Sequence, residues 1–257
     1  MSVNGLETQY KKWLLCVLLV GLCACNENNK ASLSAQSIIY CSEGSPEGFN
    51  PQTVTSGVTI DATSKQLYNQ LISFQSNENT ISPALAKSWH ITRDGKKITF
   101  YLRKNVSFHQ TPYFTPTRFF NADDVLFSFN RIIDQEHAFH NVSGGKYPFF
   151  QSVEFSKLIE SIEKINDYTV RFKLTRADNS LLVNLATDFA VILSKEYADQ
   201  LVTENQLERI DSQPIGTGPF QLKEYRAGSL IRYSPHANYW DDNSSLEQLI
   251  FDITPSN

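Results

Sequence analysis

An Asp-Gly pair next to a run of alternating apolar residues constrains the fold more than any other feature of this sequence. In the segment Lys96–Phe108, which follows Asp94-Gly95, every second residue from Ile98 to Leu102 is a large apolar one. Strict alternation is typical of a half-buried strand, and Asp-Gly is a favoured two-residue hairpin turn. The sequence therefore predicts a two-stranded antiparallel hairpin around Asp94-Gly95.

Strands and helices alternate irregularly along the rest of the chain. A second strand pair, Leu158–Ile165 and Thr169–Leu174, flanks an Asn166-Asp167 turn, and a helix begins at the capping residue Asn121 and ends near Ile133. Further strands are expected at Ile38–Tyr40, Ala84–Trp89, Phe189–Leu193, Phe220–Tyr225, Leu230–Tyr233 and Leu249–Ile253. Further helices are expected at Asp61–Ile72, Leu181–Ala186 and Ser194–Leu201. This mixture predicts a mixed α/β fold.

The N-terminus has the pattern of an export signal. Two lysines precede the apolar run Trp13–Ala24, which is shorter than the roughly 20 residues that a membrane-spanning helix needs. The run ends in Leu22-Cys23-Ala24-Cys25, which resembles a bacterial lipobox. We expect residues 1–24 to be a lipoprotein signal peptide and Cys25 to be lipidated. An ordinary secretory signal cut near Ala24, or an uncleaved anchor, is the alternative.

Composition limits the compartment and the partners of the mature part. Residues 25–37 are mostly polar and lack a hydrophobic period, which predicts a flexible tether before a folded body at 38–257. The formal net charge of −4 provides no basic field for nucleic acid. Three of the four cysteines lie at or before Cys25, so Cys41 is the one thiol of the folded part. A lone thiol is unusual in an oxidising compartment.

No catalytic or metal-binding signature stands out. The sequence contains neither a G-x-S-x-G elbow nor an H-E-x-x-H zinc motif. His137 and His140 have H-x-x-H spacing, but a zinc site usually needs a third protein ligand, so loop histidines are favoured. Gly216-Thr217-Gly218 lacks the Lys-Ser/Thr of a phosphate loop and is read as a chain reversal. We expect no enzyme activity, no metal and no cofactor.

Six segments, taken together and in order, resemble one family. They are Tyr40–Gln52, Ala84–His109, Phe120–Ile132, Val142–Phe150, Asp188–Ala198 and Pro214–Tyr225. They are similar to the family 5 solute-binding proteins of bacterial ABC importers. Tyr40–Gln52 looks most like the dipeptide-binding branch, whereas Phe114–Arg118 and Glu224–Gly228 look like Sap-type proteins.

The resemblance implies the mixed-sheet first lobe of a two-lobed, periplasmic-binding-protein-like (type II) fold. It implies a periplasmic receptor, held to a membrane by its lipid, that captures di- to oligopeptides in a cleft and delivers them to a permease in the inner membrane. The chain stops at Asn257, directly after a predicted strand, so the second lobe is expected to be missing. The charged peptide termini would then lack their counter-charges, and binding should be impaired.

The resemblance also implies site residues. Ser56, Gly57, Val58 and Thr59 match a segment along the cleft, where main-chain groups can pair with a peptide as an added strand does. An ordinary turn before the following helix is the alternative for these four residues. Cys41 matches a cysteine whose disulfide partner is absent from this chain. Alternative functions are a haem- or glutathione-binding receptor of the same family, a secreted hydrolase, or a surface lipoprotein without a ligand.

Overall fold

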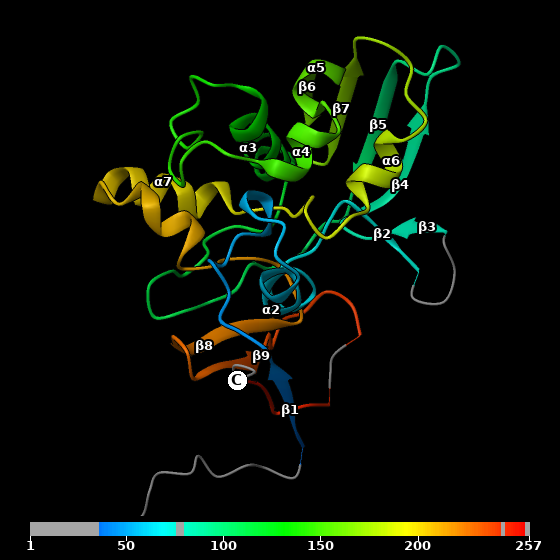
Figure 1. Ribbon diagram of the computed structural model, residues 1–257. Coiled ribbons are helices and arrows are strands. Elements are labelled where there is room, and N and C mark those ends of the chain that lie inside the picture. The colour runs from blue at the N-terminus through cyan, green and yellow to red at the C-terminus, as the bar shows by residue number, and fades with distance from the viewer. Residues whose placement is uncertain (1–35, 76–79, 243–244, 255–257) are drawn as a thin grey trace, which may run out of the picture. The chain divides into compact units, whose positions relative to one another are not determined.

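The predicted hairpin belongs to a four-stranded antiparallel sheet in the computed structural model, which describes residues 36–75, 80–242 and 245–254 (Figure 1). Gly95 turns the hairpin with a φ of 67°, a conformation open to glycine without steric cost. Both predicted strand pairs are confirmed. The strands are β4 (Ala86–Ile91), β5 (Lys97–Leu102), β6 (Ile159–Asn166) and β7 (Thr169–Leu174), in the order β4-β5-β7-β6.

A second four-stranded sheet is mixed. Its strands are β1 (Ser37–Ser42), β8 (Phe220–Arg226), β9 (Leu230–Pro235) and β10 (Gln248–Ile253), in the order β1-β10-β9-β8. The first strand pairs in parallel with the last, Ser37 opposite Gln248, and the other neighbours are antiparallel. Two strands that are neighbours in the sheet are therefore separated in sequence by almost the whole described chain. A small third sheet pairs β2 (Ile72–Phe74) with β3 (Ile81–Pro83), and the predicted mixed α/β class is confirmed.

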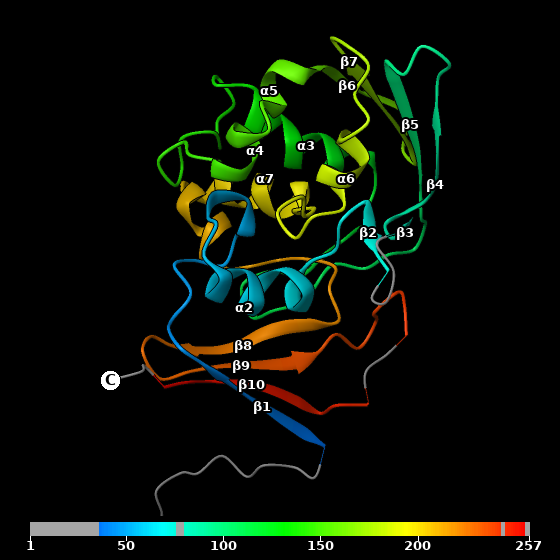
Figure 2. The same ribbon diagram turned by 45° about the vertical axis from the view of Figure 1, so that its right-hand side comes forward.

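Two longer helices each accompany one sheet. Helix α2 (Gly57–Leu67) lies along the mixed sheet in both views (Figure 1, Figure 2), and the Tyr233 hydroxyl of β9 donates to the Ala62 carbonyl. Helix α3 (Ala122–Ile133) contacts β6 and β7 and begins with a capping box at Asn121. The other helical segments are η2 (Pro51–Thr53), α4 (Pro148–Ser152), α5 (Phe155–Leu158), α6 (Leu181–Leu185), α7 (Lys195–Glu204) and η3 (Leu207–Asp211).

Two expected elements differ from the structure. The helix predicted at Asp61–Ile72 spans Gly57–Leu67, because Tyr68 is extended and the Leu67 carbonyl accepts from Gly218 N–H at 3.0 Å. The strand predicted at Phe189–Leu193 is wrong: its only ladder contact is the bridge between Gln70 and Val191. Residues 190–193 are buried, so this apolar run indicated burial and not a strand.

The described residues belong to one compact unit, residues 36–257. The predicted signal peptide and most of the predicted tether lie outside the described residues, and Cys25 lies there too. Within the described ranges, no helix combines the length and the apolarity that crossing a bilayer requires.

A buried ion pair connects α3 to η3. Arg131 donates from both Nη atoms to the Asp211 carboxylate, at 2.9 and 3.0 Å, and Asn50 and Ser143 donate to the same carboxylate. Burial alone would raise the pKa of Asp211, but Arg131 and these donors hold that pKa below its ordinary value. Removing one partner of such a pair leaves a buried charge without a counter-charge. Because Asn50 and Ser143 donate to the same carboxylate, the pair also anchors the loops that carry these two residues.

The predicted chain reversal at Gly216 and Gly218 packs directly on the end of α2. A Cβ on Gly216 would lie 1.9 Å from the Leu67 carbonyl oxygen, and a Cβ on Gly218 would lie 2.5 Å from the Leu67 carbonyl carbon. Both distances are far inside van der Waals contact, and the atoms met are backbone atoms that cannot rotate away. Glycine is therefore required at both positions, and the reason is backbone packing.

We predict that Gly218→Ala lowers the free energy of unfolding by about 3 kcal/mol or more, because the added methyl group must displace backbone. Gly44→Ala is the matched control: nothing lies within 4 Å of its Cβ position, and the change should stay below about 1 kcal/mol. Urea unfolding followed by circular dichroism measures both. Equal effects of the two substitutions would contradict the close approach.

Candidate functional site

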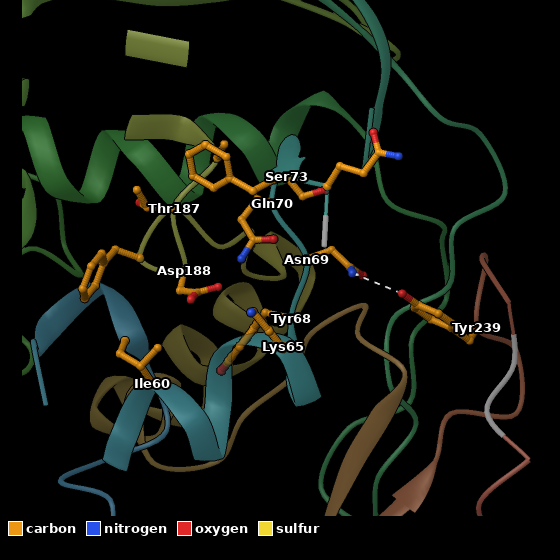
Figure 3. Close-up of a pocket in the computed structure, with 13 residues that line it drawn as sticks. Ile60, Lys65, Tyr68, Asn69, Gln70, Ser73, Thr187, Asp188 and Tyr239 are labelled. Carbon is orange, nitrogen blue, oxygen red and sulfur yellow. Dashed lines mark hydrogen bonds between the residues drawn. The ribbon is translucent and has the colours of Figure 1, made fainter. Parts of the chain in front are cut away.

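A cavity of about 1100 Å³ opens beside α2 (Figure 3). Three parts of the chain form its wall: α2 with the residues that follow it, the loop after α6, and a tyrosine from the β9–β10 connection. The lining residues are Ile60, Lys65, Tyr68, Asn69, Gln70, Ser73, Phe74, Gln75, Ala186, Thr187, Asp188, Phe189 and Tyr239. We call this cavity the main pocket.

Asn69 fixes one side of the main pocket. Its Oδ1 accepts from Thr217 Oγ1 at 2.9 Å and from Trp240 Nε1 at 3.0 Å, and its Nδ2 donates to the Tyr239 hydroxyl at 3.4 Å (Figure 3). Burial raises the pKa of Tyr239 above its ordinary value. The amide therefore ties the β9–β10 connection to the chain that leaves α2.

The opposite side is held by main-chain contacts to the loop after α6. The Ser64 hydroxyl of α2 donates to the Asp188 carbonyl at 2.7 Å and accepts from Gln70 Nε2 at 3.3 Å. The amide of Ile192 donates to the Asn69 carbonyl at 3.0 Å. These bonds hold the Asp188 loop beside α2, and in Figure 3 the Asp188 side chain lies between Ile60 and Gln70.

Aromatic side chains give the main pocket an apolar wall. Phe189 stacks on Phe149 with the ring centroids 4.5 Å apart and the planes 16° from parallel, and Phe74 is 42% exposed. Lys65 and Asp188 place one charge of each sign on the lining. A ligand that carries hydrogen-bonding groups, both charges and an apolar side chain would match this wall.

The predicted site residues Ser56 to Thr59 form the start of α2 and do not line the main pocket. Ser56 is its N-cap, and the Ser56 carbonyl accepts from the Ile60 amide at 3.0 Å. Carbonyls inside a helix are occupied, whereas the first N–H groups have no partner within the helix. The segment can therefore offer amide donors to a ligand but not the alternating donors and acceptors of a strand. Ile60, one residue later, lines the main pocket.

Cys41 is exposed on β1, and its thiol is free among the described residues. The neighbouring residues Ile38 and Tyr40 line a second hollow of about 360 Å³ between this edge strand and α2. His137 and His140 do not assemble a metal site. The Nδ1 of His137 accepts from the Phe139 amide, the Nδ1 of His140 bonds to the Arg131 carbonyl, and no group of three metal-ligating side chains occurs in the described part of the chain.

Two buried histidines hold the glycine segment behind the main pocket. His109 Nε2 and His236 Nδ1 both bond to the Gly218 carbonyl at 3.0 Å, and His109 Nδ1 accepts from the Gly216 amide at 3.2 Å. Because the carbonyl can only accept, each histidine donates from the nitrogen that faces it. Burial, followed by the neighbouring His236, lowers the pKa of His109 to about 3, and burial also lowers the pKa of His236.

The main-pocket residues have no sequence signature. Asn69, Asp188 and Tyr239 lie in three separate segments, and only the folded chain brings them together. Of the resembling segments, Asp188–Ala198 carries two lining residues, so the resemblance alone pointed to part of the wall.

Comparison with known proteins finds similar sequences over most of the chain. Residues 80–257 match the family model described as bacterial extracellular solute-binding proteins, family 5 Middle. The dipeptide-binding protein of Escherichia coli K12 is 47% identical over 239 residues, which is 93% of this chain and 45% of that protein. Heme-binding protein A of Haemophilus influenzae is 43% identical over 91% of this chain and 45% of its own length.

A solved structure agrees with the fold. The crystal structure of a dipeptide binding protein from Pseudoalteromonas sp. SM9913 in complex with Met-Leu superposes with a TM-score of 0.84 at 50% identity. It covers 86% of this chain and 44% of that one. The chain thus spans less than half the length of these relatives.

We predict that the histidine pair makes the fold sensitive to acid. The folded pKa of His109 lies below the value of about 6.5 for an unfolded histidine, so unfolding takes up a proton. The stabilisation is complete above about pH 6.5 and is lost as the pH falls toward the folded pKa; each histidine contributes a slope of up to about 1.4 kcal/mol per pH unit.

The His236→Asn variant tests this slope. The asparagine amide can still donate to Gly218 but cannot titrate, so urea unfolding between about pH 6.5 and 5 should show a smaller pH dependence than the wild type. His90→Asn, at an exposed histidine of β4, is the control and should follow the wild-type curve. An unchanged slope in His236→Asn would rule out the pair as the source.

Proposed function

Because this chain belongs to the bacterial extracellular solute-binding proteins of family 5, we propose that it forms the peptide-binding face of the substrate-binding component of an ABC importer. Members of this family are solute-binding proteins. The relatives are about twice as long as this chain, so the activity of the whole receptor is inferred here from the part that is present.

The chemistry of the main pocket supports a peptide ligand. A peptide presents main-chain N–H and C=O groups, two terminal charges and variable side chains. The main pocket offers amide side chains at Asn69 and Gln70, the opposite charges of Lys65 and Asp188, and the stacked Phe189. The single observation that carries the proposal is this combination in the main pocket, in a fold shared with a dipeptide-binding structure.

The N–H groups at the start of α2 are proposed to contribute as donors. Ser56, Gly57, Val58 and Thr59 remain the sequence-based prediction for ligand contact. The helix geometry favours a carbonyl or carboxylate of the ligand as the group that they meet. Glycine at position 57 leaves open space, since no atom lies within 4 Å of its Cβ position.

Location and partners follow from the same family membership. We propose that the protein works in the periplasm, where it delivers its ligand to a permease of the inner membrane, and that Cys25 carries a lipid anchor. We further propose that Cys41, free and exposed here, forms a disulfide with a cysteine outside this chain when the receptor is complete.

Peptide binding is tested with the purified 257-residue chain and the dipeptide Met-Leu. Amide resonances of Asn69, Gln70 and Thr187 should shift saturably in two-dimensional NMR, with weak affinity because one face of the site is present. Phe189→Ala should weaken binding by about tenfold, since it removes an aromatic wall. Phe119→Ala, at an exposed phenylalanine that does not line the main pocket, should leave the affinity unchanged.

Haem is the competing ligand, because a heme-binding protein is 43% identical to this chain. Haem and glutathione are titrated under the same conditions as Met-Leu. Shifts of main-pocket resonances by haem and none by dipeptides would replace the peptide assignment. Turnover of peptide or ester substrates would instead indicate a hydrolase, and silence toward every ligand would leave a lipoprotein without one.

The lipid anchor is tested by Cys25→Ser expressed in a Gram-negative host. The variant should move from the membrane fraction to the periplasmic fraction and lose incorporation of radiolabelled palmitate, because the modified thiol is gone. Cys16→Ser, inside the apolar run of the leader, should leave both properties unchanged. Membrane retention of Cys25→Ser would contradict lipidation.

A further inference from the structure

A basic hollow lies outside the main pocket, where β4 begins and β5 ends. It has a volume of about 370 Å³, and its wall includes Lys87, Arg103, Lys104 and Trp240. The whole sequence has a formal net charge of −4. A hollow lined by three cations therefore has a local charge opposite in sign to that of the whole chain. We call it the basic pocket.

These cations have no salt-bridge partner in the part of the chain that the structure describes. Lys104 lies over the ring of Tyr168, with Nζ 5.1 Å from the centroid. A cluster of like charges raises its own free energy and favours an anion that lowers it.

Arg103 is held in a fixed orientation. Its Nε donates to the Ala84 carbonyl at 2.6 Å, its main-chain amide donates to the Leu85 carbonyl at 2.8 Å, and its guanidinium lies 4.6 Å from the ring centroid of Trp240. The indole is fixed in turn by its hydrogen bond to Asn69. Little side-chain entropy remains to be lost when a ligand binds.

The free edge of Arg103 has the geometry of an oxyanion receptor. With Nε bonded to Ala84, the two Nη groups remain as a parallel pair of donors, which matches the two oxygens of a carboxylate or phosphate. Arg103 is not fully buried, so these donors can be reached from solvent. Lys87, which is exposed on the same wall, supplies a second positive charge.

We propose that the basic pocket is a second binding site, specific for an oxyanion of the carboxylate or phosphate class, with Arg103 as its bidentate donor. This site is separate from the peptide site proposed above and does not depend on it. Its ligand is recognised by two coplanar oxygens and a negative charge, whereas the main pocket offers both charges and an aromatic wall.

The indole N–H resonance of Trp240 reports on the site, because its ring lies against Arg103. We titrate the 257-residue chain with sodium phosphate and, separately, sodium acetate, and hold the ionic strength constant with sodium chloride. Both oxyanions should shift this resonance saturably, whereas chloride should not. A shift that is linear in salt and equal for chloride would reduce the site to general screening and overturn the proposal.

Substitutions distinguish the paired Nη donors of Arg103 from the effect of its positive charge alone. Arg103→Lys keeps the charge but loses the paired donors, so oxyanion affinity should fall by about tenfold or more. Lys97→Gln removes an exposed lysine at the far end of β5 and should not change the affinity. Unchanged affinity in Arg103→Lys would overturn the bidentate assignment. If that variant does not fold, Lys87→Gln, at an exposed position, should still weaken binding several-fold.

Discussion

The close approach of Gly216 and Gly218 to the carbonyl of Leu67 is the constraint on which the site depends. It ends α2 at Leu67, since the Gly218 amide takes the last helical carbonyl and Tyr68 turns into an extended conformation. The chain from Asn69 onward is thereby directed along the main pocket instead of continuing as helix. His109 and His236 both donate to the Gly218 carbonyl, so the glycine segment joins elements from several parts of the sequence.

Local features of the sequence were sufficient for elements whose signals are local. The Asp94-Gly95 turn, the Asn121 cap and the Ser194 cap all depend on residues within a few positions, and each is present in the structure. The mixture of predicted strands and helices indicated the α/β class, and the family resemblance added the lobe type. The motifs that carried the resemblance include the glycine segment. Where burial and strand formation give the same apolar pattern, as in residues 190–193, sequence alone had no means to separate them.

The wall of the main pocket could not be predicted, because its hydrogen bonds are tertiary. Asn69 looks like an ordinary polar residue in the sequence, yet its amide joins Thr217, Tyr239 and Trp240. The predicted segment Ser56–Thr59 was chosen for its likeness to a cleft-lining stretch. Its helical conformation restricts it to donating hydrogen bonds, which is a property of backbone dihedrals that residue identities did not reveal.

Trp240 makes the two proposed sites neighbours in a physical sense. Its indole N–H bonds to Asn69, which fixes one side of the main pocket, and its ring face packs against the guanidinium of Arg103 in the basic pocket. An oxyanion bound to Arg103 would partly neutralise the positive charge that faces the indole ring. A ligand against Asn69 would alter the group that accepts from the indole N–H. One rigid side chain therefore shares contacts with both sites, and linkage requires that any effect of one ligand on the affinity for the other be equal in both directions.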